Sequence, residues 1–113
     1  MSWRHLWPML LLLPLLAGAD TPTPQATDRE ALALGRRVLA VQAALDNPTA
    51  PGSLAAIRAL GLDSRHYTMV RGWLMQQLLG DLGILEADPE NAPPAVRKRI
   101  AFLQRAIRAI DLE

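Results

Sequence analysis

Apolar residues recur at the spacing of an α-helix along most of this 113-residue chain, and this repeat limits the fold more than any other feature. The clearest stripe is formed by Val96, Ile100, Leu103, Ile107 and Ile110, and it places all its members on one face of a helix. No segment shows the alternation of apolar and polar residues that is typical of strands. The sequence therefore predicts an all-α protein.

Capping and breaking residues set the bounds of the first two predicted helices. Thr27 and Glu30 form a capping box at the start of a long first helix, which ends before Pro48. Ser53 is predicted to cap a short second helix. Gly61 is expected to follow that helix in a left-handed conformation.

The third helix, expected over about residues 64–85 after a cap at Asp63 or Ser64, is apolar on nearly all sides and should lie in the middle of the bundle. One stripe of it is formed by Tyr67, Val70, Leu74, Leu78 and Leu85, and another strip holds Gly72 and Gly80. These glycines are expected where a neighbouring helix approaches closely, because glycine weakens a helix.

The fourth helix follows a predicted cap at Asn91. The expected fold is a small helical bundle of three long helices and one short one, which follows an N-terminal signal peptide.

The start of the chain has the order of a secretory signal. A polar stretch with Arg4 precedes the apolar segment Leu6–Leu16, and small residues follow at Ala17–Ala19. Cleavage is expected between Ala19 and Asp20. The predicted organisation is a signal peptide over residues 1–19, a flexible Pro/Thr-rich leader over residues 20–26, and a helical domain over residues 27–113.

Composition narrows the function classes. The chain has no cysteine, which excludes disulfides, thiol catalysis and zinc–thiolate sites. Loss of Arg4 with the signal would leave equal numbers of basic and acidic residues, so net charge gives no reason to expect a nucleic-acid partner. Residues 54–70 superficially resemble a DNA-binding helix-turn-helix. However, Ile57 stands where that motif prefers a small residue.

The first candidate surface lies on the third helix and holds nearly all the unusual side chains of the expected mature chain. Tryptophan and arginine are common anchors of protein interfaces, so a partner groove is one interpretation, and ordinary core packing is the other. The residues of this aromatic strip are His66, Tyr67, Arg71, Trp73, Gln76 and Gln77.

The second candidate is a basic surface on the fourth helix, opposite its apolar stripe. It could meet an acidic partner, a polyanion or an anionic lipid surface, or it could simply be a solvated face. Its residues are Arg97, Lys98, Arg105 and Arg108.

These features predict a small periplasmic or secreted protein that acts as a non-catalytic binding or envelope-accessory module. The expected partner is an unidentified protein of the cell envelope, and no cofactor or metal is expected. One alternative is a scaffold held at the inner membrane by an uncleaved signal. The other is a small hydrolase that uses His66, but Ser64 lies only two positions away and so points to another side of the helix.

Overall fold

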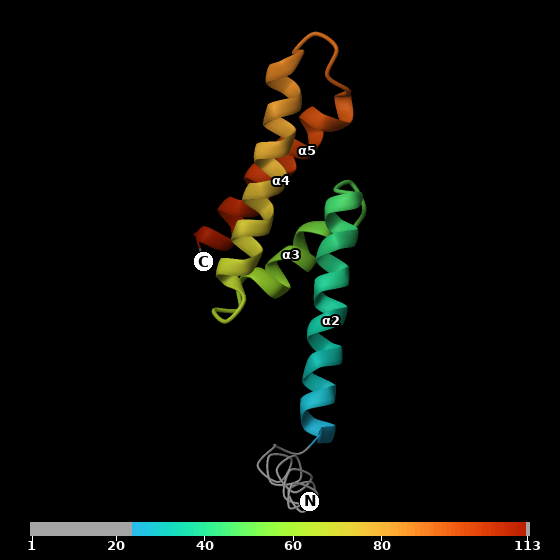
Figure 1. Cartoon of the computed structure of the whole chain (residues 1–113), viewed down its shortest axis with the longest axis vertical. Coiled ribbons are helices and arrows are strands. Elements are labelled where there is room, and N and C mark those ends of the chain that lie inside the picture. The colour runs from blue at the N-terminus through green and yellow to red at the C-terminus, as the bar shows by residue number, and fades with distance from the viewer. Residues whose placement is uncertain (1–23, 113) are drawn as a thin grey trace, which may run out of the picture. The chain divides into compact units, whose positions relative to one another are not determined.

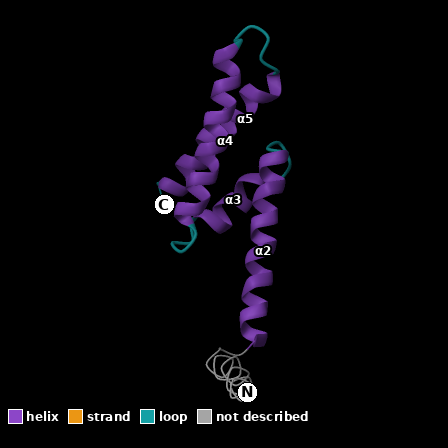
Figure 2. Ribbon diagram, in the orientation of Figure 1, coloured by secondary structure: helices purple, strands orange, loops and turns teal. Residues whose placement is uncertain are grey.

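The computed structural model describes residues 24–112, and regular structure in this range is entirely helical. Figures 1 and 2 show the helices, which are α2 (Pro24–Asp46), α3 (Ser53–Gly61), α4 (Tyr67–Ala87) and α5 (Pro94–Asp111). The predicted all-α fold, with three long helices and one short one, is confirmed. No helix between residues 24 and 112 is long and apolar enough to cross a membrane.

The chain separates into two units, Met1–Ala33 and Leu34–Glu113. Within the first unit, the structure describes residues 24–33, which form the beginning of α2, and residues 25–33 are exposed. The predicted signal peptide and its cleavage site lie outside the described residues. The helix begins at Pro24 and not at Thr27, so the end of the predicted extended leader is helical. Proline suits the first turn of a helix, where its missing N–H leaves no hydrogen bond unmade.

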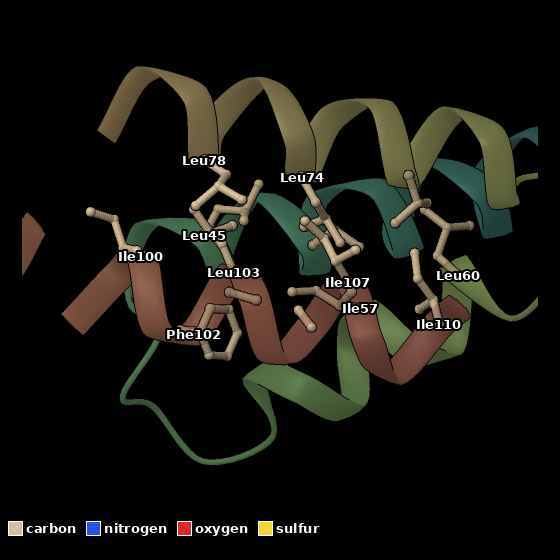
Figure 3. Close-up of a cluster of buried hydrophobic side chains, with 14 of the residues drawn as sticks. Leu45, Ile57, Leu60, Leu74, Leu78, Ile100, Phe102, Leu103, Ile107 and Ile110 are labelled. Atoms are coloured by element: carbon tan, nitrogen blue, oxygen red, sulfur yellow. The ribbon is translucent and has the colours of Figure 1, made fainter. Parts of the chain in front are cut away.

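The core of the second unit is formed where α3, α4 and α5 pack on one another, and the most extensive contact is between α4 and α5. The later part of α2 adds Val41, Ala44 and Leu45 to this core. In Figure 3, Leu74 and Leu78 point from α4 toward the apolar stripe of α5. The predicted stripes of these helices are therefore confirmed as core. The largest fully buried side chains are Ile57, Leu60, Leu74, Leu103, Val41 and Val70.

The predicted central position of the third helix is wrong. One face of α4 is buried, whereas Met69, Leu79 and Ile84 are 48%, 62% and 48% exposed. The helix with the most buried residues is α5, which also buries Phe102, a residue outside its predicted stripe. An apolar composition thus did not reveal which sides of α4 have a neighbour.

Two predictions about glycine are also wrong. Gly61 is the last residue of α3 and has no left-handed backbone, since Gly52 is the one described residue with a positive φ, at 82°. Gly61 is needed for close packing, because a Cβ there would lie 2.7 Å from Cγ2 of Ile110. Gly72 and Gly80, in contrast, have nothing within 4 Å of a Cβ position among the described residues.

The helix caps differ from those predicted. The N-cap residues of α3, α4 and α5 are Gly52, His66 and Pro93, and none provides a side-chain cap. Asn91, the predicted cap of the last helix, instead donates a hydrogen bond from Nδ2 to Oδ2 of Asp88 at 2.9 Å. Side chains that could cap a helix are here used within the loops.

Candidate functional site

The aromatic strip begins with two residues that are tied to the end of α5. The hydroxyl of Tyr67 donates a hydrogen bond to Oδ1 of Asp111. Nε of Arg71 lies 3.1 Å from the same oxygen and 3.3 Å from Oδ2. The first turns of α4 place Tyr67 and Arg71 one above the other, so both reach one carboxylate.

This cluster changes the ionisation of all three side chains. Its hydrogen bond to Asp111 raises the pKa of Tyr67 above 10.0, because the hydroxyl must lose its proton beside a carboxylate. The same bond, and then Arg71, lower the pKa of Asp111 below 3.8. Asp111 also raises the pKa of the Arg71 guanidinium. The cluster therefore keeps Asp111 charged and Tyr67 neutral. These charge states preserve the bonds between α4 and the end of α5, which is a structural role.

The remaining residues of the strip do not join Tyr67 and Arg71 in one surface. Trp73 is half-buried and packs against the core. His66 is half-buried at the start of α4, and Gln76 and Gln77 are exposed. On a helix, Gln76 projects away from the side that carries Tyr67 and Arg71. The six residues are thus divided between an internal cluster, a packed tryptophan and an exposed side.

The hydrolase alternative requires a nucleophile and a carboxylate beside His66. The Ser53 hydroxyl instead donates to the carbonyls of Asn47 and Ala50, each at 3.0 Å. The Asp63 carboxylate accepts hydrogen bonds from Arg65, and these lower its pKa from 3.8 to about 2. Among the described residues, no catalytic hydrogen-bond chain is assembled at His66, and no three His or acidic side chains gather as a metal site.

The predicted basic surface of α5 also divides into two strips. Nη2 of Arg97 donates a hydrogen bond to the carbonyl of Pro89 at 2.8 Å and so fixes the loop before α5. Arg108 lies on the same side of the helix, three turns further along. Lys98 and Arg105 lie two turns apart on the neighbouring side. They line a pocket.

The pocket has a volume of about 660 Å³ and lies between α5 and the loop that joins α2 to α3. This loop is held by its own hydrogen bonds. The amide of Ala50 donates to the Asn47 carbonyl at 3.1 Å, and the buried Ser53 hydroxyl binds two loop carbonyls. Gly52 then turns the chain into α3 in a left-handed conformation that strains other residues. One wall of the loop–α5 pocket is therefore a fixed turn.

The lining of the loop–α5 pocket combines apolar and basic groups. Phe102 lies nearly buried in its lining, and the guanidinium of Arg105 lies 5.7 Å from the centre of the Phe102 ring. Lys98 and Arg105 are exposed, and no described carboxylate lies within ion-pair distance of either. The apolar lining residues are Pro48, Leu54, Ala50, Ala95, Ala101 and Phe102.

Two further charged residues, Asp46 and Arg99, line the pocket. Asp46 accepts a hydrogen bond from Nε2 of Gln42 at 2.9 Å. Arg99 turns to Asp81 on α4 and binds both of its oxygens, at 2.7 and 2.5 Å. Arg99 is balanced by Asp81, whereas Asp46 keeps its negative charge because its partner is a neutral amide. Lys98 and Arg105 therefore leave one positive charge in excess in the lining.

Several of these residues carry no predictive signal in the sequence. Asp81, Asp111 and Phe102 were not predicted as parts of any site. Tyr67 and Asp111 are 44 positions apart, and Asp81 and Arg99 are 18 apart, so no local pattern connects them. The one sequence signal for the Asp81–Arg99 pair was Arg99 itself, an arginine at the border of the apolar stripe of α5.

A second depression, of about 510 Å³, is lined by Gly61, Leu62, Ser64, Tyr67 and Ile110. It has no acidic or basic side chain in its lining, so the loop–α5 pocket has the stronger means of selecting a ligand.

No protein-family model matches the chain, and comparisons with curated proteins and with solved structures also find no match.

Proposed function

We propose that this protein is a small exported, non-catalytic binding module. Its partner would be a cell-envelope protein that places an acidic segment with an apolar side chain in the loop–α5 pocket. The observation that carries this proposal is the pairing of two exposed cations, Lys98 and Arg105, with an apolar lining in one pocket.

The basic residues and the apolar residues of the loop–α5 pocket both contribute to this recognition. A carboxylate near Lys98 and Arg105 would gain two favourable charge interactions, which mainly give orientation and fast association. An apolar side chain over Pro48 and Leu54 would gain burial, at roughly 25 cal/mol per Å² of surface removed from water. An extended polyanion uses the first interaction only, so the mixed lining favours a protein segment.

Chemical-shift mapping tests the proposed ligand chemistry directly. The probe is a short synthetic peptide with two carboxylates beside a leucine, and its control is the same peptide with amides in place of the carboxylates. We expect the acidic peptide to move the backbone signals of Gly52 and Ala101, and the amide peptide to leave them in place. Equal effects of the two peptides would contradict selection by charge.

Charge reversal tests the natural partner. The protein and its variants are used to capture proteins from the envelope fraction of the source cells. Lys98→Glu/Arg105→Glu should lose the partner, whereas Arg29→Glu/Arg36→Glu on α2 makes the same change in net charge and should retain it. Raised salt should weaken the wild-type capture. A partner retained equally by both double variants would overturn the proposal.

Export is tested by the N-terminus of the protein recovered from cells. Mass spectrometry should find Asp20 as the first residue. A protein that keeps Met1 and sediments with the membrane would support the signal-anchored scaffold instead. A protein that keeps Met1 and stays soluble in the cytoplasm would overturn both.

A further inference from the structure

The outward side of α4 is unusual for a helix that faces water. Residues at helical spacing, opposite the buried line of Val70 and Leu74, form what we call the outer strip: Met69, Gly72, Gln76, Leu79 and Gly83. Exposed helix faces normally carry charged residues, but none of these five is charged. The charged residues nearest in sequence, Arg71 and Asp81, are engaged with residues of α5. The outer strip is therefore an uncharged surface with two large apolar side chains.

The glycines of this side have no explanation within the described chain. Gly72, Gly80 and Gly83 have nothing within 4 Å of a Cβ position. Each glycine costs roughly 1 kcal/mol of helix stability relative to alanine. Close approach of another backbone is a common compensation for glycine in a helix. No described helix makes that approach, so this side of α4 leaves room for a helix of another molecule.

We propose that α4 pairs in an antiparallel manner with α4 of a second copy, about a two-fold axis at Gln76. This axis places Met69 of one copy opposite Gly83 of the other, because both lie seven positions from Gln76. Gly72 then faces Gly80 in the same way. Met69 therefore meets a position without a side chain, and two backbones can approach at the glycines. Leu79 lies opposite Trp73, because both are three positions from Gln76. The alternation of three and four positions in the outer strip is also the spacing of a coiled-coil seam.

Charge complementarity selects the antiparallel orientation. The turn before α4 carries Arg65, whose side chain is 76% exposed although it binds Asp63. The end of α4 is acidic, with Glu86 and Asp88. Antiparallel pairing brings each basic start beside an acidic end, whereas parallel pairing would bring the two acidic ends together. At the axis, the Gln76 amide can both donate and accept, so two copies can form reciprocal hydrogen bonds.

Sedimentation equilibrium of the protein, produced from its full-length gene, tests this self-association over roughly 1 to 100 µM, a range suited to an interface of modest size. We expect a monomer–dimer equilibrium that Leu79→Glu abolishes. Leu39→Glu is the matched control, because Leu39 is 69% exposed on α2 and Leu79 is 62% exposed on α4. A wild-type monomer throughout would overturn the proposal. So would equal dimerisation of wild type and Leu79→Glu, or equal loss in both variants.

The glycines allow a test in which stability and association move in opposite directions. Gly83→Ala should raise the melting temperature of the monomer, because its Cβ meets open space, and should weaken the dimer about tenfold or more. Gly35→Ala on α2 also meets open space, so it should raise the melting temperature without weakening the dimer. A dimer as strong in Gly83→Ala as in wild type would contradict close approach at this strip.

Cysteine cross-linking tests the orientation, and the chain has no cysteine of its own. Gln76→Cys should form a covalent dimer on mild oxidation. Met69→Cys alone should not, because its two copies would lie about 21 Å apart along the axis at 1.5 Å per residue, beyond disulfide reach. Mixing Met69→Cys with Gly83→Cys should give the mixed dimer. Cross-linking of every single variant alike would indicate parallel pairing and overturn the proposal.

The dimer and the proposed binding function can fail separately. No residue of α4 lines the loop–α5 pocket. Lys98→Glu/Arg105→Glu should therefore leave the monomer–dimer equilibrium unchanged, and loss of the dimer in that variant would overturn the placement of the interface on α4.

Discussion

Arg99 on α5 binds both carboxylate oxygens of Asp81 on α4, with Nε 2.7 Å from Oδ2 and Nη2 2.5 Å from Oδ1. The Asp81 side chain is 7% exposed and the Arg99 side chain is 30% exposed. This pair fixes the register of the two helices that make the most extensive contact in the protein. Its two members should respond differently to substitution, since Arg99 alone has access to water.

Arg99→Met should lower the free energy of unfolding by about 3–5 kcal/mol, because it leaves the buried Asp81 charge without a partner. Asp81→Asn should cost less, since Arg99 can turn toward solvent. The double variant Asp81→Leu/Arg99→Met should recover much of the loss. Urea denaturation measures all three, and a greater loss for Asp81→Asn than for Arg99→Met would contradict the asymmetry.

Asp111→Ala should return the pKa of Tyr67 toward 10.0, because it removes the acceptor of its hydrogen bond and the adjacent charge. Tyr67 is the single tyrosine of the chain, so the tyrosinate absorbance reports it alone. Glu86→Ala, which removes a carboxylate elsewhere, should leave that titration unchanged. The same titration curve in wild type and Asp111→Ala would show that the Tyr67–Asp111 bond is not formed in solution.

Stability should follow pH at both ends of the range through this cluster. Asp111 has a lowered pKa, so its contribution is present above pH 3.8 and is lost as pH falls through the folded-state value. Tyr67 has a raised pKa, so its contribution is present below pH 10.0 and is lost as pH rises through the folded-state value. In Asp111→Ala, the free energy of unfolding should vary less with pH at both ends. Unaltered profiles would contradict this linkage.

Gly61→Ala should lower the free energy of unfolding by about 1–3 kcal/mol, since overpacking displaces a neighbour. The added Cβ would lie 2.7 Å from Cγ2 of Ile110 and 3.2 Å from Cγ1 of Val70. Gly35→Ala, which meets open space, should instead gain up to about 1 kcal/mol. Thermal denaturation compares the two variants, and a stabilised Gly61→Ala would show that α3 and α5 are not in close contact there.

Leu74→Ala should cost about 2–5 kcal/mol, the range for a fully buried leucine. Leu79→Ala on the same helix should change monomer stability by only about 0.5 kcal/mol, because Leu79 is 62% exposed. Denaturation of dilute protein separates this effect from self-association. Equal losses in the two variants would mean that α4 is covered on both sides.

The sequence by itself determined that the chain is helical and which faces of α4 and α5 are turned inward. The stripe from Val96 to Ile110 and the line of Val70, Leu74 and Leu78 are buried as predicted. Both depend on local geometry, because residues three and four apart on a helix share a side whatever the rest of the chain does. The break at Pro48 is local in the same sense.

Only the tertiary structure decided which other sides of the helices have neighbours and which distant side chains meet. The apolar composition of α4 suggested a central helix, yet Met69 and Leu79 are exposed. Tyr67 was predicted as part of a partner surface, yet it binds Asp111 at the far end of the chain. The pocket likewise joins the loop after α2 to one side of α5. These contacts depend on how whole helices pack, because a helical repeat specifies which residues share a face but not what that face will meet.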